Sequence, residues 1–213
     1  MLPVHTALSE VFPDGGLRRG SVVACQGQAA GSVALALATG PSQTGSWIGL
    51  VGLGATWGLG AAAEWGIALD RVLSIPVVSA AQLPTVLAAV VDGVDVVVTM
   101  GTGVRAGDAR RLAARLTQRG GVLLVLGDPG GFAPDLVCTA SGSTWEGLAA
   151  GSGRLVARQV RLEVSGRRAD RARRADLWFP GSTGTPRRVQ VDTAGVDVAG
   201  DLHQQPLRIA SVG

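Results

Sequence analysis

The sequence predicts an α/β protein whose sheet is mostly parallel, has flanking helices and finishes in antiparallel strands. Short apolar runs alternate with helical patterns as far as residue 126. Connections rich in Gly and Pro separate these runs. After residue 131 the apolar runs follow one another without a helical pattern between them. The first pattern is typical of parallel strands joined by right-handed crossovers, and the second is typical of antiparallel strands.

Each element of the parallel part has a local signal in the sequence. A helix that follows the first strand is expected to stop at Gly40-Pro41, and Pro84 suits the first position of a later helix. The clearest amphipathic pattern is at 108–119, with leucines inward and arginines largely outward. The elements expected here are a strand at 21–26, a helix at 32–39, a strand at 47–51, a helix at 61–69, a strand at 71–75, a helix from Pro84 to Gly93, a strand at 95–100, a helix at 108–119 and a strand at 122–126.

The last third of the chain is expected to supply the antiparallel strands. Val160, Leu162 and Val164 alternate with polar residues, as in a strand with one buried face. We predict a core over residues 1–180. Residues 181–213 are polar and rich in Gly and Pro, so we predict a C-terminal tail that can fold on a partner protein. The antiparallel strands are expected at 136–140, 155–164 and 175–179, and a further strand at 187–191 is left open.

Composition excludes several classes of protein. The chain has 213 residues, of which 46% are hydrophobic and 16% charged, so disorder throughout is excluded. Its two long uncharged stretches are interrupted by Pro and Gly, so we predict no membrane span and a cytoplasmic protein. Cys25 and Cys138 each lie in an apolar run, which predicts buried free thiols. With His5 and His203 near opposite ends of the chain, we expect no metal site.

A Gly-rich turn between the first strand and the first helix is the organising feature of the sequence. This layout places backbone N–H groups and a helix N-terminus where a P-loop binds phosphate. A P-loop continues with Gly-Lys-Ser/Thr, whereas the residues after Gly27 that correspond to it here are Gly31, Ser32 and Val33. All 19 basic residues of the chain are Arg, so no Lys can replace the missing one. We expect a degenerate loop and no bound cofactor.

Four segments together resemble the ATPase core of RecA, in the same order and with similar spacing. They read FPDGGLRRGSVVACQGQAAGS, AAAEWGIALDRVLSIP, VDVVVTMG and ARRLAARLTQRGGVLLVLG. More closely, the chain resembles the shortened RecA-like accessory proteins of the actinobacterial mutagenic repair cassette, the ImuA′ type. The resemblance covers roughly residues 10–180. It implies a RecA-like, P-loop NTPase-type fold with degenerate Walker motifs.

The departures from RecA remove the catalytic residues of an ATPase. Where RecA proteins carry the water-activating Glu, this chain reads Val51-Gly-Leu-Gly-Ala55. Where a Walker B Asp would hold Mg²⁺, it reads Thr99-Met100, and the nearby Asp108 is better explained as a helix cap. Phosphoryl transfer depends on charge neutralisation by Lys and Mg²⁺. The combined losses predict a protein that is not an enzyme.

The resemblance also implies partners and a biological setting. It implies a non-catalytic subunit of a mutasome induced by DNA damage as part of the SOS response. That subunit docks a catalytically inactive Y-family polymerase homologue, ImuB, and through it supports translesion synthesis by an error-prone C-family DNA polymerase. The chain lacks the N-terminal module through which RecA polymerises, so no filament is expected. We expect a cytoplasmic protein that joins the nucleoid when induced. Two alternatives are a DNA-binding regulator of RecA and a weak nucleotide-binding relative of the ATPases.

Arginines gather between residues 154 and 174, where eight of them occur. One interpretation is contact with DNA phosphates, which needs cations and no particular base sequence. The other is a solvated or protein-binding loop, because no aromatic residues are interleaved for base stacking. The residues are Arg154, Arg158, Arg161, Arg167, Arg168, Arg171, Arg173 and Arg174.

Overall fold

The computed structural model describes residues 1–54, 57–149, 152–181 and 184–189. Within them a large, mostly parallel sheet has flanking helices and ends in antiparallel strands, which confirms the predicted fold class at that level. The strands are β1 (Leu2–Pro3), β2 (Gly16–Leu17), β3 (Val22–Gly27), β4 (Ile48–Val51), β5 (Val72–Ile75), β6 (Val96–Met100), β7 (Val122–Leu126), β8 (Leu136–Ala149), β9 (Ser152–Ser165), β10 (Arg173–Trp178) and β11 (Arg187–Arg188). The helices are α1 (Ala30–Gln43), α2 (Leu59–Glu64), α3 (Leu83–Gly93) and α4 (Ala106–Arg119), with short 3-10 turns elsewhere.

The main sheet has the strand order β11-β10-β9-β8-β3-β7-β6-β4-β5. From β8 to β5 every pair of neighbours is parallel. The strands β8, β9, β10 and β11 pair antiparallel with one another. The small strands β1 and β2 pair separately from this sheet. Strand β3 therefore lies inside the sheet, with the parallel strand β7 on one side and β8, the first strand of the antiparallel part, on the other.

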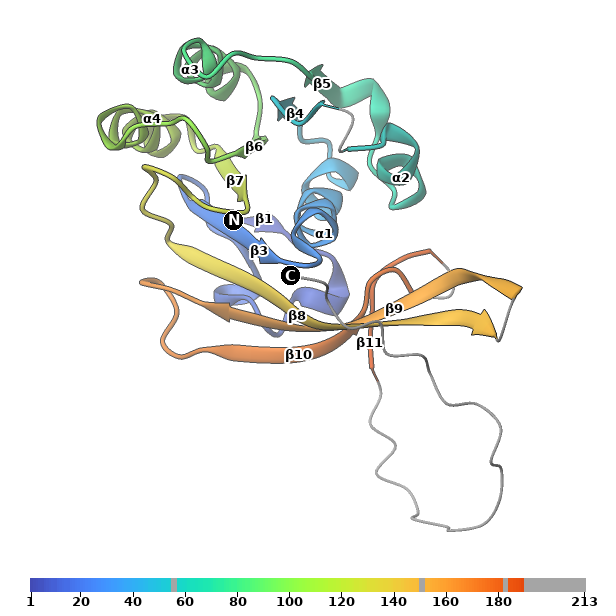
Figure 1. The fold of residues 1–213 in the computed structure, drawn as a ribbon. Coiled ribbons are helices and arrows are strands. Elements are labelled where there is room, and N and C mark those ends of the chain that lie inside the picture. The colour runs from blue at the N-terminus through green and yellow to red at the C-terminus, as the bar shows by residue number, and fades with distance from the viewer. Residues whose placement is uncertain (55–56, 150–151, 182–183, 190–213) are drawn as a thin grey trace.

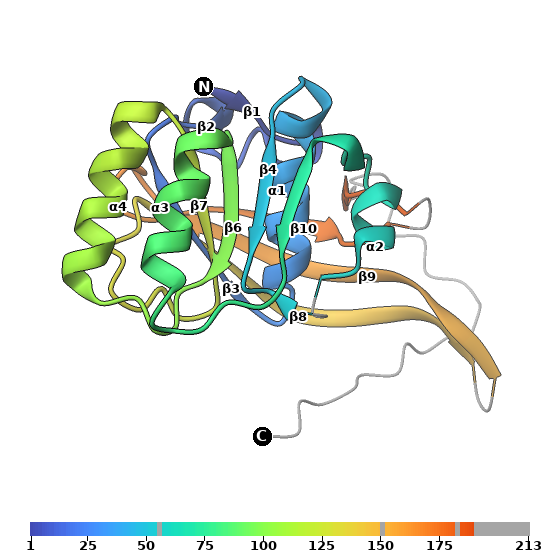
Figure 2. The ribbon, with the colours of Figure 1, turned by 90° about the horizontal axis from the view of Figure 1, so that it is seen from above.

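Helices cover the two faces of the parallel part (Figures 1 and 2). Helix α1 packs on one face, and α3 and α4 lie side by side on the other. The side chains of each strand divide between two buried clusters, as the pleat of a strand requires. Val23 and Cys25 belong to the cluster around α1, whereas Val22 belongs to the cluster around α3 and α4. Strands that are buried on both faces explain the continuous apolar runs of the sequence.

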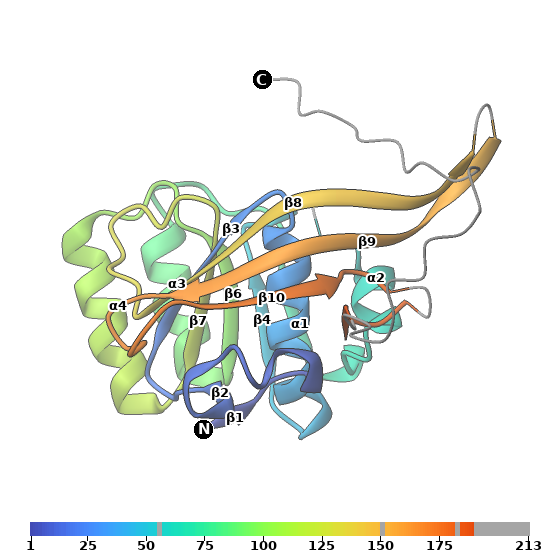
Figure 3. The ribbon, with the colours of Figure 1, turned by 90° about the horizontal axis from the view of Figure 1, so that it is seen from below.

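The antiparallel part uses one face for the core. Val160, Leu162 and Val164 are buried in the α1 cluster, and Arg161 between them is exposed, which confirms the predicted alternation. Two register irregularities interrupt the pairing of β8 with β9, between Ser141 and Thr144 and between Glu146 and Leu148. Beyond them the two strands continue past the body of the protein (Figures 2 and 3).

The predicted stop of the first helix at Gly40-Pro41 is wrong. Helix α1 continues to Gln43, where the N–H of Thr44 donates to the carbonyls of Gly40 and Pro41. Gly40 has a packing role, because a Cβ on it would lie 2.5 Å from the carbonyl oxygen of Pro3. A glycine needed for a close approach was therefore interpreted as a helix terminator.

The cap predicted at Asp108 is also wrong. Helix α4 begins at Ala106, and the residue at its N-cap position is Arg105, which makes no side-chain capping bond. Asp108 lies within the first turn and accepts a hydrogen bond from Arg111 at 2.5 Å. The carboxylate near the helix N-terminus still has a favourable interaction with the helix dipole.

The sheet extends past the predicted end of the core at Pro180. Strand β11 pairs with β10, so that Arg187 lies opposite Trp178. The remainder of the predicted tail, residues 190–213, lies outside the described residues. In the part of the chain that the structure describes, every helix is too short or too polar to cross a membrane.

A buried carboxylate ties the antiparallel part to β3. Asp135 precedes β8, and its Oδ2 accepts a hydrogen bond from the backbone N–H of Val22 at 3.0 Å. Its Oδ1 accepts bonds from Arg168 Nε at 2.8 Å and from Arg167 Nη2 at 3.3 Å. Asp135 is only 8% exposed, so its carboxylate depends on these protein donors more than on water for its hydrogen bonds.

Asp135→Ala should lower the free energy of unfolding by about 1–3 kcal/mol, because the N–H of Val22 would remain buried without an acceptor. Asp176→Ala is the matched control. It removes a carboxylate that pairs with Arg161 on the exposed face, so it should cost clearly less. Urea unfolding of both variants measures the difference. Equal losses would contradict the structural role of Asp135.

Candidate functional site

The turn after β3 is shorter than its sequence pattern suggested. Gly27 ends the strand with a φ of +85°, and α1 begins at Ala30, so that only Gln28 and Ala29 lie between them. A Cβ on Gly27 would lie 2.0 Å from the carbonyl oxygen of Ala140 on β8. Glycine is thus required both by the backbone conformation and by the adjacent strand.

The residues aligned with the phosphate-binding segment lie in the first turn of α1. Gly31, Ser32 and Val33 are helical, and Val33 is fully buried in the core around this helix. The N–H of Val33 donates to the carbonyl of Ala29 at 2.9 Å. Ala29 makes no side-chain capping bond, so this residue does not satisfy the N–H groups of the first turn of α1.

Two side chains of the protein lie beside this helix N-terminus. Arg158, from β9, donates through Nη2 to the hydroxyl of Ser32 at 2.5 Å and through Nε to the carbonyl of Phe179 at 2.8 Å. Its guanidinium lies 5.1 Å from the ring centroid of Trp145, and burial lowers the pKa of Arg158. The indole nitrogen of Trp57 lies next to Gly31.

Sequence reasoning missed the role of Arg158. It grouped this residue with the candidate DNA contacts, whereas the structure places it against Ser32. One signal was present in the sequence. Arg158 has the same parity along β9 as Val160 and Leu162, so a regular strand directs it to the buried face.

The other two positions of the ATPase pattern also lack acidic groups in the structure. At the end of β4, Val51 is buried, and Ala55 of the same segment lies outside the described residues. At the end of β6, Thr99 is buried and its hydroxyl donates to the carbonyl of Met100 at 3.3 Å. Over the described residues, no three His, Cys, Asp or Glu side chains group together to hold a metal ion.

The two cysteines lie side by side in the core. Cys25 on β3 and Cys138 on β8 are partners in the parallel register, and both are buried free thiols, as predicted. A hydrogen bond from Cys138 to Cys25 and burial raise the pKa of the Cys138 thiol well above its ordinary value. Both therefore behave as small core side chains.

The eight arginines of the predicted basic cluster do not form one surface. Arg161 and Arg174 lie on the exposed face of β9 and β10, where each pairs with a carboxylate on the adjacent strand. Arg173 pairs with Asp170 at 3.2 Å in the turn between these strands. Arg167 and Arg168 pair with the buried Asp135, as described above. Among these eight arginines, Arg154, Arg158 and Arg171 form no salt bridge with a carboxylate of the described residues.

Pairing reduces the positive charge that DNA would meet at these positions. Five of the eight arginines pair with four carboxylates, because Arg167 and Arg168 share Asp135. Arg158 is occupied at the N-terminus of α1. Direct DNA contact through this cluster therefore stays a prediction, with Arg154 and Arg171 as the members that form no salt bridge within the described residues.

Comparison with known protein families identifies one match. The family model described as the MT3502 N-terminal domain matches residues 10–131, which extend from the N-terminal segment through β7 and the connection after it. The match includes the turn after β3 and helices α1 to α4, and it ends before β8. No curated protein matches the chain.

Two glycines of the turn should respond in opposite ways to alanine. Gly31→Ala should stabilise the fold by about 0.5–1 kcal/mol, because the site is helical and a Cβ there meets only Trp57 at 3.6 Å. Gly27→Ala should destabilise strongly, because its φ is positive and its Cβ would meet the Ala140 carbonyl. Thermal unfolding of both variants tests this. A loss of stability in Gly31→Ala would contradict the placement of Gly31 in the first turn of α1 with room for a Cβ.

Proposed function

The chain belongs to the MT3502 N-terminal domain family, and from this premise we propose that it is a non-catalytic, RecA-like accessory subunit of the ImuA′ type. In this function it docks an inactive Y-family polymerase homologue, ImuB. Through that homologue it supports error-prone translesion synthesis by a C-family DNA polymerase after DNA damage. It works in the cytoplasm and at the nucleoid, as a scaffold and not as a nucleotide-driven motor.

The arrangement of the parallel strands supports the RecA-like part of the proposal. Each of the four segments that carry the resemblance coincides with a strand of the parallel part and its neighbouring helix or turn. The first contains β3 and the turn after it, the second most of α2 and all of β5, the third β6, and the fourth most of α4 and all of β7. The segments thus contribute four of the neighbouring strands between β3 and the β5 edge.

One observation carries the non-catalytic part of the proposal. Arg158 and Trp57 lie beside the helix N-terminus that would receive phosphate, and the hydroxyl of Ser32 accepts a hydrogen bond from Arg158. In active P-loop enzymes a Lys at the position of Ser32 reaches the phosphates, and a Ser or Thr hydroxyl at the position of Val33 holds Mg²⁺. This chain contains no Lys at all, and Val33 in the first turn is buried. A scaffold function is compatible with all of these features.

The polar C-terminal segment supports the docking part of the proposal. Residues after Pro180 include β11, which adds to the edge of the sheet beside β10. A segment that begins in the sheet and continues as a polar chain suits coupled folding on a partner. We propose that this segment contributes to contact with the polymerase homologue.

ATP with Mg²⁺ should bind no more tightly than about 1 mM, because a helix N-terminus without a Lys contributes only about 0.3–1 kcal/mol per anion. Isothermal titration calorimetry with the full chain measures this. Ser32→Ala serves as a matched variant, and it should leave the result unchanged. A micromolar dissociation constant that Ser32→Ala abolishes would favour the alternative of a nucleotide-binding relative.

The full chain should capture the purified polymerase homologue of its own repair cassette. A shortened chain that ends at Val189 retains β11 and should capture it clearly less well, because most of the polar segment is then missing. An active Y-family polymerase is the specificity control. Equal capture of the active polymerase, or no capture of the homologue, would overturn the proposal, and equal capture by both chains would remove residues 190–213 from the interface.

A further inference from the structure

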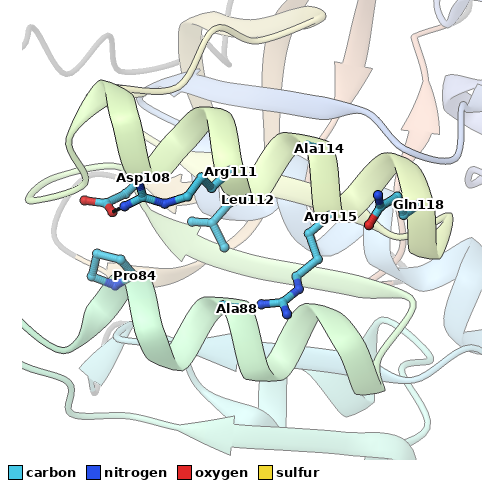
Figure 4. Close-up of a pocket in the computed structure, with 8 residues that line it drawn as sticks. All are labelled: Pro84, Ala88, Asp108, Arg111, Leu112, Ala114, Arg115 and Gln118. Carbon is cyan, nitrogen blue, oxygen red and sulfur yellow. Dashed lines mark hydrogen bonds and ion pairs between the residues drawn. The ribbon is translucent and has the colours of Figure 1, made fainter.

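A groove runs between α3 and α4 on the face of the sheet opposite α1. Figure 4 shows Pro84 and Ala88 on α3 facing α4, and Leu112 pointing from α4 toward α3. The groove has a volume of about 410 Å³. Its apolar floor comes from these three residues, and its rim carries Arg111, Arg115 and Gln118 among its polar residues.

The rim of this groove presents positive charge to solvent. The Arg111 side chain is 79% exposed, whereas Asp108, which pairs with it, is 25% exposed. Asp92 at the end of α3 is 31% exposed and pairs with both Arg115 and Arg119, which are more exposed. In each pair the guanidinium lies farther out than the carboxylate, so an approaching molecule meets the cations first.

The described helices of a second copy of this chain do not offer a suitable occupant. An apolar groove with a cationic rim is complementary to an amphipathic helix that carries carboxylates beside its apolar stripe. Among the four described helices, α1 has no acidic residue, and the others have one each: Glu64, Asp92 and Asp108. None of the described helices is acidic enough, so we take the complementary helix to come from a different protein.

Nucleic acid is a poorer match than protein for this groove. A phosphate backbone gains nothing from a floor of Pro84, Ala88 and Leu112, and the lining contains no aromatic side chain on which a base could stack. An acidic helix uses both features, because its apolar residues fill the floor while its carboxylates meet the arginines.

We propose that the α3–α4 groove is the docking site for an acidic amphipathic helix of a partner protein. The helix lies across α3 and α4 as an added layer, with leucine-sized side chains over Ala88 and carboxylates beside Arg111 and Arg115. The proposal rests on the accessory role proposed above only because it takes the occupant to be a protein. The groove is formed by residues far along the chain from the C-terminal segment.

The test uses the full chain and a synthetic helical peptide of about 18 residues, with leucine on one face and glutamate on both flanks. Ala88→Arg fills the floor but adds positive charge, so docking should weaken by about tenfold or more while simple charge attraction would strengthen. Arg111→Glu should weaken binding by about fivefold to tenfold, and Arg110→Glu, on the same helix but outside the groove, by less than about twofold. Fluorescence anisotropy measures all four proteins.

A charge-swapped peptide keeps the test independent of any one variant. With lysine in place of glutamate, the peptide should bind Arg111→Glu more tightly than the unsubstituted chain. The proposal is overturned if neither peptide binds with a dissociation constant below about 1 mM, or if Ala88→Arg binds the glutamate peptide as tightly as the unsubstituted chain. It is also overturned if Arg110→Glu and Arg111→Glu lose the same affinity for the glutamate peptide. It is also overturned if a DNA duplex binds this face and gains affinity from Ala88→Arg. Loss of peptide binding together with intact capture of the polymerase homologue would reject the groove and keep the accessory role.

Discussion

The pairing of β8 with β3 is the contact on which the rest of the structure depends. It joins the parallel part of the sheet to the antiparallel part, because β3 is parallel to β8 and β8 is antiparallel to β9. Three features make the pairing fit. Gly27 leaves room for the Ala140 carbonyl, and the small side chains of Cys25 and Cys138 are partners in the register. Asp135 accepts a hydrogen bond from the N–H of Val22. A larger side chain at Gly27 would separate the strands.

The same pairing explains the state of the degenerate loop. Once β8 lies beside β3, strand β9 follows, and Arg158 reaches the N-terminus of α1. Arg158 also binds the carbonyl of Phe179, whose ring is stacked on Trp65 at 5.8 Å between centroids. The helix N-terminus is therefore one side of a packed junction. Retaining the strand-turn-helix layout without its phosphate chemistry is understandable, because the junction needs the layout for folding.

The sequence predicted local features well and contacts between distant segments poorly. Strand β7 was predicted at its observed bounds, since a fully apolar strand between Gly121 and Gly127 has only one local interpretation. The expected bounds of helix α1 were wrong at both ends. At the C-terminal end the reason is that Gly40 leaves room for the carbonyl of Pro3, a residue far from it in the chain. The contact between Arg158 and Ser32 spans 126 positions and depends on the register of two strand pairs. No local pattern contains that register.

Arginine clusters illustrate why a run of charges in sequence is a weak guide to function. Arg168 and Arg19 hold elements together through Asp135 and Asp95, so their charge is used inside the fold. The surface potential depends on which arginines have carboxylates within reach, and those carboxylates come from elsewhere in the chain. In the α3–α4 pair the carboxylates of Asp108 and Asp92 are less exposed than the guanidinium groups that they pair with, so the guanidinium groups face solvent. Recognition by charge is thus decided by the placement of sixteen acidic residues as much as by nineteen basic ones.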